Sequence, residues 1–406
     1  MRVSVDFGGQ SLELELPDEQ LVAAWRPPEG HSRADSAEIV RAALEAPRDF
    51  PPLRQSVVPG DRVTIAFDPS IPEGGLVLEA VAGTLREAGV EPDGLTVLLP
   101  RASSSDLVSS LPTGTTLVVH DPDDRTQLAY LATTNEGRRI YLNRSLTDAD
   151  LVVPVGRVGF DPILGYCGPW SVVFPGLTSR ESIDAHRSRL RRGDEARGES
   201  AARTNRAESS EVSWLLGTLF HFGVIPGAGG IAELLAGLES SVSERGIAWL
   251  DEHWTFRPES RAELVVAGIG GGEGPSSLES LAEGLATARR LVQHGGKIVV
   301  LSHAAGAVGP SLRCLIDAGG AERGLKVLHG HEKDDDFHIA SRIAEAVAWA
   351  DVFLYSGLDR ELVEDLSMVS VEKPEQARRL VAQCRSALVV SLADWTRARA
   401  QDDEES

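Results

Sequence analysis

The residues best suited to chemistry lie between positions 149 and 186. Leu151 to Val155 form an apolar run typical of a buried strand, and Asp161 follows it. A glycine-rich loop, Gly165-Tyr166-Cys167-Gly168, then leads to Ser171, and His186 ends the segment. A carboxylate can act as a base, and a histidine can transfer protons or bind a metal. These residue types indicate acid-base or metal-assisted chemistry on a small ligand.

Two residues from other parts of the chain complete the candidate group. Arg101 and His120 each follow a predicted strand, as Asp161 does. His120 could orient a loop beside the ligand, or it could cap a turn at the end of its strand with Asp121. Asp161 could face the ligand together with Arg157, or the two could form a solvated ion pair that contributes little. The sequence leaves both alternatives open.

The segments around these residues predict an α/β fold. Short apolar runs alternate with helical patterns such as Leu76 to Ala88, and this alternation is typical of a largely parallel sheet. The predicted strands of the first domain are Val63–Phe67, Leu95–Leu99, Thr116–His120 and Leu151–Val155. Ligands of such folds usually bind where loops follow the carboxyl ends of strands. We therefore expect the loops after Phe67, Val155 and Val266 to line one cleft.

A second α/β unit is predicted near the end of the chain. Its signals are a strand at 262–267, a helix at 277–293 and strands at 297–302 and 387–392. We expect domains at 1–255 and 260–400, a cleft between them, and a disordered tail at 401–406. The charged stretch 187–212 predicts a surface helix and a loop.

The glycine loop and its flanks resemble the signature of the nickel-pincer lactate racemase family. Further segments resemble the same family in the same order along the chain. They are Phe7-Gly8-Gly9 with Leu12, Leu14 and Leu16, Asp68-Pro69-Ser70-Ile71-Pro72, His120-Asp121-Pro122-Asp123-Asp124, Asn143-Arg144, Pro175-Gly176 and Gly295-Gly296-Lys297. The resemblance implies a two-domain α/β fold and racemisation or epimerisation of a small 2-hydroxy acid.

The resemblance also implies a cofactor, a nicotinic-acid-derived mononucleotide that is joined to a lysine and holds nickel. Ser171 stands at the position of that lysine, and no lysine precedes Lys297. Asp161 stands at one of the two acid-base histidines, and Arg101 lies beside the other. We therefore expect no covalent attachment here. The positions that would line the cofactor site are Asp68, Ser70, Gly165, Tyr166, Gly168 and Ser171.

Metal binding has two candidates. His186 matches the family's nickel ligand approximately, but it could instead lie on a helix face against Asp184 or Arg187. The tract from His329 to His338 holds three histidines and several carboxylates, which suit zinc or nickel. The same residues suit a solvated loop before a helix at 339–350. We favour the non-metal interpretation for both.

Two glycine runs could cradle a phosphate. One spans Gly268 to Gly274, and the other spans Gly227 to Ala232 before a predicted helix at 232–238. Pro226 argues against a strand before the second run. A hinge or a tight turn is the simpler interpretation of both runs.

Composition limits the partners. The chain has 406 residues and a formal charge of −21, which argues against nucleic acid. It lacks a signal-peptide pattern and an apolar run long enough for a membrane span, so we expect a cytoplasmic protein. Three separated cysteines indicate reduced thiols. The partner is a small molecule, a 2-hydroxy acid or a nucleotide. Two hypotheses follow: an isomerase with a non-covalently held cofactor, or a non-catalytic relative that binds a ligand.

Overall fold

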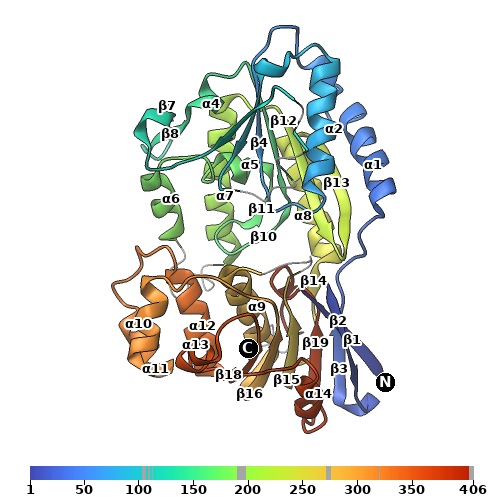
Figure 1. The fold of residues 1–406 in the computed structure, drawn as a ribbon, viewed down its shortest axis with the longest axis vertical. Coiled ribbons are helices and arrows are strands. Elements are labelled where there is room, and N and C mark those ends of the chain that lie inside the picture. The colour runs from blue at the N-terminus through green and yellow to red at the C-terminus, as the bar shows by residue number, and fades with distance from the viewer. Residues whose placement is uncertain are drawn as a thin grey trace. The chain divides into compact units, whose positions relative to one another are not determined.

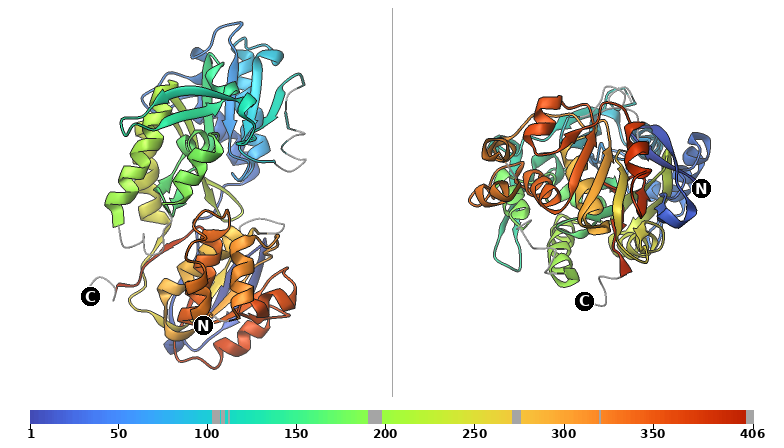
Figure 2. Two further views of the ribbon diagram at one scale, coloured as in Figure 1. Left: turned by 90° about the vertical axis from the view of Figure 1, so that its left-hand side faces the viewer. Right: turned by 90° about the horizontal axis from the view of Figure 1, so that it is seen from below.

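A computed structural model describes residues 1–102, 107, 110–111, 113–189, 198–270, 276–319 and 321–401. The chain forms two compact units, which are coloured along the sequence in Figures 1 and 2. The central unit is Glu29–Asp251, and the terminal unit combines Met1–Pro28 with Glu252–Ser406. Both units are α/β with largely parallel sheets, which confirms the predicted fold class.

The central unit is built on a six-stranded sheet in the order β13-β12-β9-β4-β5-β6. Only β13 runs antiparallel to its neighbour. The strands are β4 (Val63–Phe67), β5 (Leu95–Leu99), β6 (Thr116–Val119), β9 (Leu151–Arg157), β12 (Phe220–Gly227) and β13 (Gly230–Leu238). The order reverses between β4 and β9, because β5 and β6 follow β4 on one side and β9 returns on the other. Such a reversal is where α/β sheets bind ligands.

Helices and a hairpin cover both faces of this sheet. On one face α1 (Arg33–Glu45) and α2 (Gly74–Glu87) bury valines and leucines against β4, β5 and β12. The other face is covered by α4 (Arg144–Thr147), α5 (Pro169–Val173), α7 (Gly198–Leu216) and the hairpin of β7 (Leu128–Thr133) and β8 (Arg139–Asn143). The elements α6 (Arg180–Arg187), α8 (Glu239–His253), β10 (Gly159–Asp161) and β11 (Gly165–Cys167) complete the unit.

The terminal unit has a second six-stranded parallel sheet in the order β18-β17-β16-β15-β19-β3. Its strands are β3 (Leu21–Trp25), β15 (Ala262–Gly268), β16 (Val292–Leu301), β17 (Asp351–Tyr355), β18 (Val369–Ser370) and β19 (Ala387–Val390). One face packs against α9 (Leu278–Leu291), α10 (Pro310–Ala318) and α12 (Phe337–Trp349). The other packs against β1 (Arg2–Phe7), β2 (Gln10–Glu15) and α14 (Gln376–Val381). Shorter elements are α11 (Ala321–Val327), α13 (Arg360–Asp365), β14 (Thr255–Phe256) and β20 (Arg397–Ala398).

The first 28 residues belong with the C-terminal part of the chain. The strand β3 pairs with β19, and the hairpin of β1 and β2 buries Val5, Leu12 and Leu14 against the sheet. In Figure 1 this blue hairpin lies beside the red strand β19. No local pattern predicts this grouping, because strand pairing across 360 or more positions depends on tertiary packing rather than on propensity.

One predicted helix is wrong. Residues 232–238 form part of β13, which pairs with β12 in a hairpin. Gly229 turns the chain at a φ of +75°, which a glycine adopts without strain. Pro226 lies inside β12 at a register shift, where a missing N–H donor is tolerated. The run Gly227 to Ala232 is therefore a hairpin turn and not a phosphate loop.

Further sequence predictions concern the charged stretch 187–212, the glycine run that begins at Gly268, the C-terminal tail and membrane-spanning segments. The stretch 187–212 contains most of α7, which continues to Leu216, and Glu208, Ser209 and Val212 are buried, so the helix is not purely a surface element. Gly271 to Gly274 and the tail after 401 lie outside the described residues. Within the described part of the chain, no helix combines the length and apolarity needed to cross a membrane.

Candidate functional site

Polar residues gather where β4 and β9 end, at the reversal of strand order in the central sheet. Asp68 follows β4, and its backbone N–H donates to the carbonyl of Val155 at 2.9 Å. Its carboxylate accepts from the backbone N–H and the hydroxyl of Ser70 at 2.9 and 2.6 Å, and from the backbone N–H of Arg157 at 3.4 Å. Asp68 and Ser70, both predicted site residues, therefore form one turn beside the end of β9.

The small hairpin of β10 and β11 follows β9 directly. Asp161 pairs with Gly165, and its side chain accepts from the backbone N–H groups of Ile163 and Leu164 at 2.8 and 2.7 Å. Gly165 has a φ of +71°, which favours glycine at this turn. The Asp161 carboxylate thus caps the turn that contains it. That role matches the structural use expected of aspartate in turns.

Cys167 is buried beside three charged residues at this edge. Burial raises the pKa of its thiol to about 11, with smaller effects from the charges of Arg157, Asp161 and Asp68. The thiol itself lies against the carbonyls of Arg157 and Gly159, at 3.8 and 3.5 Å. Cys167 itself remains a protonated thiol near neutral pH, because a thiolate in an apolar, sealed site is costly.

Tyr166 is buried and has a structural role. Its hydroxyl donates to the carboxylate of Asp251 at 2.5 Å, and the guanidinium of Arg206 lies 5.2 Å from the centre of its ring. Arg206 also donates to the carbonyl of Leu164 at 2.7 Å. These contacts tie the β10–β11 hairpin to α7.

Ser171 lies in the first turn of α5, and its hydroxyl is already used. It donates to the carbonyl of Gly168 at 2.5 Å, and the Ser171 N–H donates to the same carbonyl at 2.9 Å. Gly168 is needed here because a Cβ atom would lie 2.2 Å from the ring of Trp170. The loop and the helix are therefore packed around a serine, and the position supplies a hydroxyl where the family's attachment requires an amine.

His186 lies on α6, and its side chain is buried. Burial lowers its pKa to about 3, with further lowering by the charges of Arg189, Arg138 and Arg187. Its ring lies 6.0 Å from that of Phe174 in an edge-to-face arrangement. Among the described residues Nδ1 of His186 has no hydrogen-bond partner. The imidazole is neutral near pH 7, which is the form that can ligate a metal.

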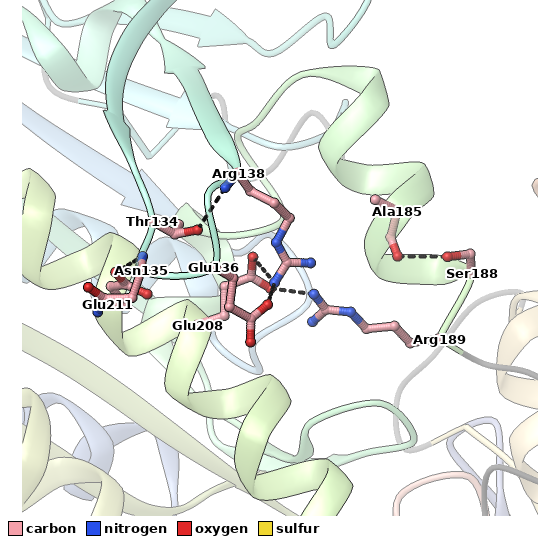
Figure 3. Close-up of polar contacts among 9 residues, drawn as sticks. All are labelled: Thr134, Asn135, Glu136, Arg138, Ala185, Ser188, Arg189, Glu208 and Glu211. Carbon is pink, nitrogen blue, oxygen red and sulfur yellow. Dashed lines mark hydrogen bonds and ion pairs between the residues drawn. The ribbon is translucent and has the colours of Figure 1, made fainter.

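A buried ion-pair cluster lies close to His186. Arg138 and Arg189 both contact the carboxylate of Glu208, at 2.5 and 2.6 Å, and Figure 3 shows the two guanidinium groups converging on it. Arg138 also contacts Glu136 at 2.7 Å. The cluster joins the tip of the β7–β8 hairpin to α7, and it explains the positive field that acts on His186. No sequence pattern indicates this cluster, since Glu208 lies in a charge-rich stretch typical of a solvated surface.

His120 and Arg101 occupy the ends of β6 and β5. His120 is buried, and its Nδ1 accepts from the amide of Asn143 at 3.1 Å while Nε2 donates to the carbonyl of Thr178 at 2.8 Å. Burial lowers its pKa, and both nitrogens are occupied, so His120 positions a loop. Arg101 is exposed. In strand order the edge thus carries Arg157, Asp68, Arg101 and His120 after β9, β4, β5 and β6.

A cavity of about 410 Å³ lies at the opposite, amino edge of the same sheet. Its lining includes Arg62, Thr64, Thr96, Gln127, Asn143 and Arg144. None of the predicted site residues lines this cavity, although Asn143, which does, also bonds His120.

Comparisons with known proteins include matches to one family model, to one relative by sequence and to two similar solved structures. Residues 7–198 match the model of the lactate racemase N-terminal domain. A lactate racemase from Thermoanaerobacterium thermosaccharolyticum is 23% identical over 330 residues, which cover 75% of this chain and 74% of that protein. The structure of the lactate racemase apoprotein from the same organism has a TM-score of 0.77 at 17% identity, covering 98% of this chain and 100% of that one. A Thermotoga maritima protein of known structure has a TM-score of 0.66 at 13% identity, covering 93% and 100%.

Proposed function

The chain is a lactate racemase-like family member, and on that premise we propose that its central unit binds a small 2-hydroxy acid without racemising it. The ligand lies at the carboxyl edge of the sheet, where the strand order reverses. Arg101 provides a positive charge for its carboxylate, as arginine does in many carboxylate sites. No covalently attached nickel-pincer cofactor takes part.

Ser171 is the observation that carries this proposal. A linkage to the family's cofactor needs a nucleophilic amine, and Ser171 offers a hydroxyl that is bonded to the carbonyl of Gly168. No lysine occurs among residues 29–251, so the central unit holds no side-chain primary amine at all. The residues present do not fit the covalent form of the cofactor.

The candidate acid-base residues also favour binding over catalysis. A racemase that inverts a carbon needs a proton-transfer group on each side of the substrate. Asp161 caps its own turn, and His120 has both ring nitrogens occupied. His186 is buried, with a pKa of about 3. Each of these groups has a structural explanation, and burial lowers the pKa of both His120 and His186, which makes them weaker bases.

Metal and intact-mass analysis after co-expression with the family's cofactor-synthesising enzymes tests the cofactor. We expect an unmodified mass and no nickel. The Ser171→Lys variant is the matched comparison, because it restores the amine at the same position. An adduct on S171K alone would locate the defect in this one side chain. About one nickel per wild-type chain with a nucleotide-sized adduct would overturn the proposal.

Calorimetric titration with each enantiomer of lactate tests binding. Removal of a charge-assisted hydrogen bond costs about 1.5–3 kcal/mol, so Arg101→Ala should weaken binding roughly tenfold to hundredfold. Arg144→Ala is the control, since Arg144 is also exposed but lines the cavity at the amino edge. Equal losses in both variants, or no binding by the wild-type chain, would contradict the proposed site.

An active isomerase is the second candidate function, favoured by the charged group around Cys167. Asp68 accepts from the backbone N–H of Arg157 at the end of β9, and Asp161 follows in the next hairpin, so two carboxylates and a cation belong to neighbouring segments of this edge. A chiral assay of L-lactate incubated with the protein decides between the two functions. Interconversion that disappears in Asp161→Asn would support the isomerase, and unchanged L-lactate supports the binding function.

A further inference from the structure

The terminal unit brings a cysteine, a histidine and an aspartate together. Cys314 lies on α10, and its sulfur is 3.5 Å from Nε2 and 4.0 Å from Nδ1 of His331. Nδ1 of the same ring is 2.9 Å from the carboxylate of Asp334. Cys314 is partly exposed, as are the side chains of His331 and Asp334, at 37% and 26%. The arrangement gives a nucleophile, a base and a group that orients the base.

The histidine-rich tract was also a candidate metal site. The Cys314 sulfur lies beside both nitrogens of the His331 ring, and Nδ1 of that ring is bonded to Asp334. Among the described residues no group of three or more potential metal ligands converges. The histidine-rich tract is thus not assembled as a metal centre. Asp336 is the one buried carboxylate of this tract, and it is bonded to the backbone at the start of α10.

Hydrogen bonds fix the loop against the helix. Asp336 accepts from the backbone N–H groups of Ser311 and Leu312 at 3.0 and 2.9 Å, and so caps the start of α10. A Cβ atom at Gly309 would lie 2.3 Å from this carboxylate, so glycine is required before the helix. The Ser311 hydroxyl donates to Asp334 at 2.9 Å. The carboxylate that orients His331 is therefore itself oriented.

The backbone N–H groups at the start of α10 limit the reactions that the site can support. Acyl transfer needs N–H groups that stabilise an oxyanion, and the N–H groups of Ser311 and Leu312 are bonded to Asp336. Thiol–disulfide exchange needs only a thiolate, a base and access to the sulfur. We propose that Cys314, His331 and Asp334 form a reactive-thiol site that exchanges with low-molecular-weight disulfides.

The reaction balances without any other reagent. His331 takes the proton of the Cys314 thiol, and Asp334 stabilises the imidazolium that results. The thiolate attacks one sulfur of the disulfide, so a bond forms between Cys314 and that sulfur while the original S–S bond breaks. The second sulfur leaves as a thiolate and takes the proton from His331. The small disulfide is reduced to one free thiol, and Cys314 is oxidised to a mixed disulfide.

The chain supplies two internal controls. Cys167 and Cys384 are buried, and burial raises the pKa of both thiols, that of Cys167 to about 11. Neither should react in the folded protein. The native chain should therefore show one fast-reacting thiol of three, and its mixed disulfide should map to the peptide that contains Cys314.

Stopped-flow reaction with 5,5′-dithiobis(2-nitrobenzoic acid), followed by peptide mass analysis, tests the site. We expect His331→Gln to lower the second-order rate constant at pH 7 about tenfold or more, since a positioned base contributes on this scale or above. His329→Gln is the matched control, because His329 is 91% exposed and contacts Glu332 instead. It should leave the rate unchanged, and oxidised glutathione should give the same ranking.

Asp334→Asn keeps the test decisive if H331Q fails to fold. It preserves size, and it should lower the rate about threefold by removing the charge that stabilises the imidazolium. Thermal unfolding monitored by circular dichroism shows which variants are folded. Equal rates in the wild-type chain and the folded variants would overturn the proposal. So would an unmodified Cys314 while Cys167 or Cys384 reacts.

Discussion

The two units place the same residue types in opposite surroundings. In the central unit Cys167, His186 and Glu208 are sealed, and their charges and protons are controlled by burial and by arginines. In the terminal unit Cys314 and His331 are partly exposed, the sulfur lies beside the imidazole, and the imidazole contacts a carboxylate. Residue type therefore does not decide between a structural and a chemical role, whereas solvent access and neighbouring groups do.

The largest expected contrast is between the two cysteines. A thiol with a pKa of about 11 is ionised to only about one part in a thousand at pH 8. Iodoacetamide should therefore modify Cys167 more than about a hundredfold more slowly than Cys314 in the folded chain. Peptide mass analysis over a time course measures both rates in one sample, and urea should abolish the difference. Similar rates without urea would mean that Cys167 is not sealed.

Glu208 tests what the sealed charges contribute. Glu208→Gln leaves Arg138 and Arg189 without their shared carboxylate beside a buried histidine. Loss of one partner from a buried ion pair costs roughly 3–5 kcal/mol, and partial exposure of Arg138 should reduce this to about 2–3 kcal/mol. Urea unfolding measures the change. Glu136→Gln, which removes a mostly exposed partner of the same arginine, should cost less than about 1 kcal/mol.

Acidification should lower the free energy of unfolding, because the central unit contains buried histidines. Burial lowers the pKa of His186 and of His221 to about 3, against 6.5 for an unperturbed histidine. The unfolded chain then binds more protons, so the free energy of unfolding falls as the pH drops below 6.5 and continues to fall until about pH 3. At pH 5 each histidine should cost about 2 kcal/mol.

His221→Leu separates this effect from the titration of other groups. His221 is fully buried on β12, and leucine retains an apolar side chain of moderate size there. The variant should lose the contribution of His221, about 2 kcal/mol, from the difference in unfolding free energy between pH 7.5 and pH 5. His329→Gln, at an exposed position, should leave that difference intact. Equal pH dependence in all three proteins would show that burial of His221 does not control its proton.

The sequence predicts the sheets better than the site, for a physical reason. Strands such as 63–67 and 95–99 lie in the sequence as continuous apolar runs, because parallel strands are buried on both faces. The same reasoning fails for the β12–β13 hairpin. Residues 231–238 are apolar enough for either a helix or a buried strand, and Gly229 decides in favour of the turn.

Site geometry depends on contacts that no local pattern contains. Asp161 and Ser171 are recognisable by their position in a motif, but their hydrogen bonds to a turn and to Gly168 require the folded loop. Glu208 meets Arg138 across 70 positions, and Cys314 meets His331 across a helix boundary. The histidine tract at 329–338 gave a signal of the right region. Its chemistry became apparent only when the direction of each ring nitrogen was known.

The last comparison concerns two glycines, Gly168 and Gly83. It relates the packing of the Trp170 ring to solvent access at Cys167. A Cβ atom at Gly168 would lie 2.2 Å from the Trp170 ring, so Gly168→Ala must shift that ring, at a cost of about 1–3 kcal/mol. Gly83, inside α2, has open space for a Cβ, so Gly83→Ala should stabilise by about 0.5–1 kcal/mol. Because Gly168 follows Cys167 directly, G168A should also speed alkylation of Cys167, and G83A should not. If G168A left that rate unchanged, the Trp170 ring would not be part of what seals Cys167, and the contrast with Cys314 would rest on depth alone.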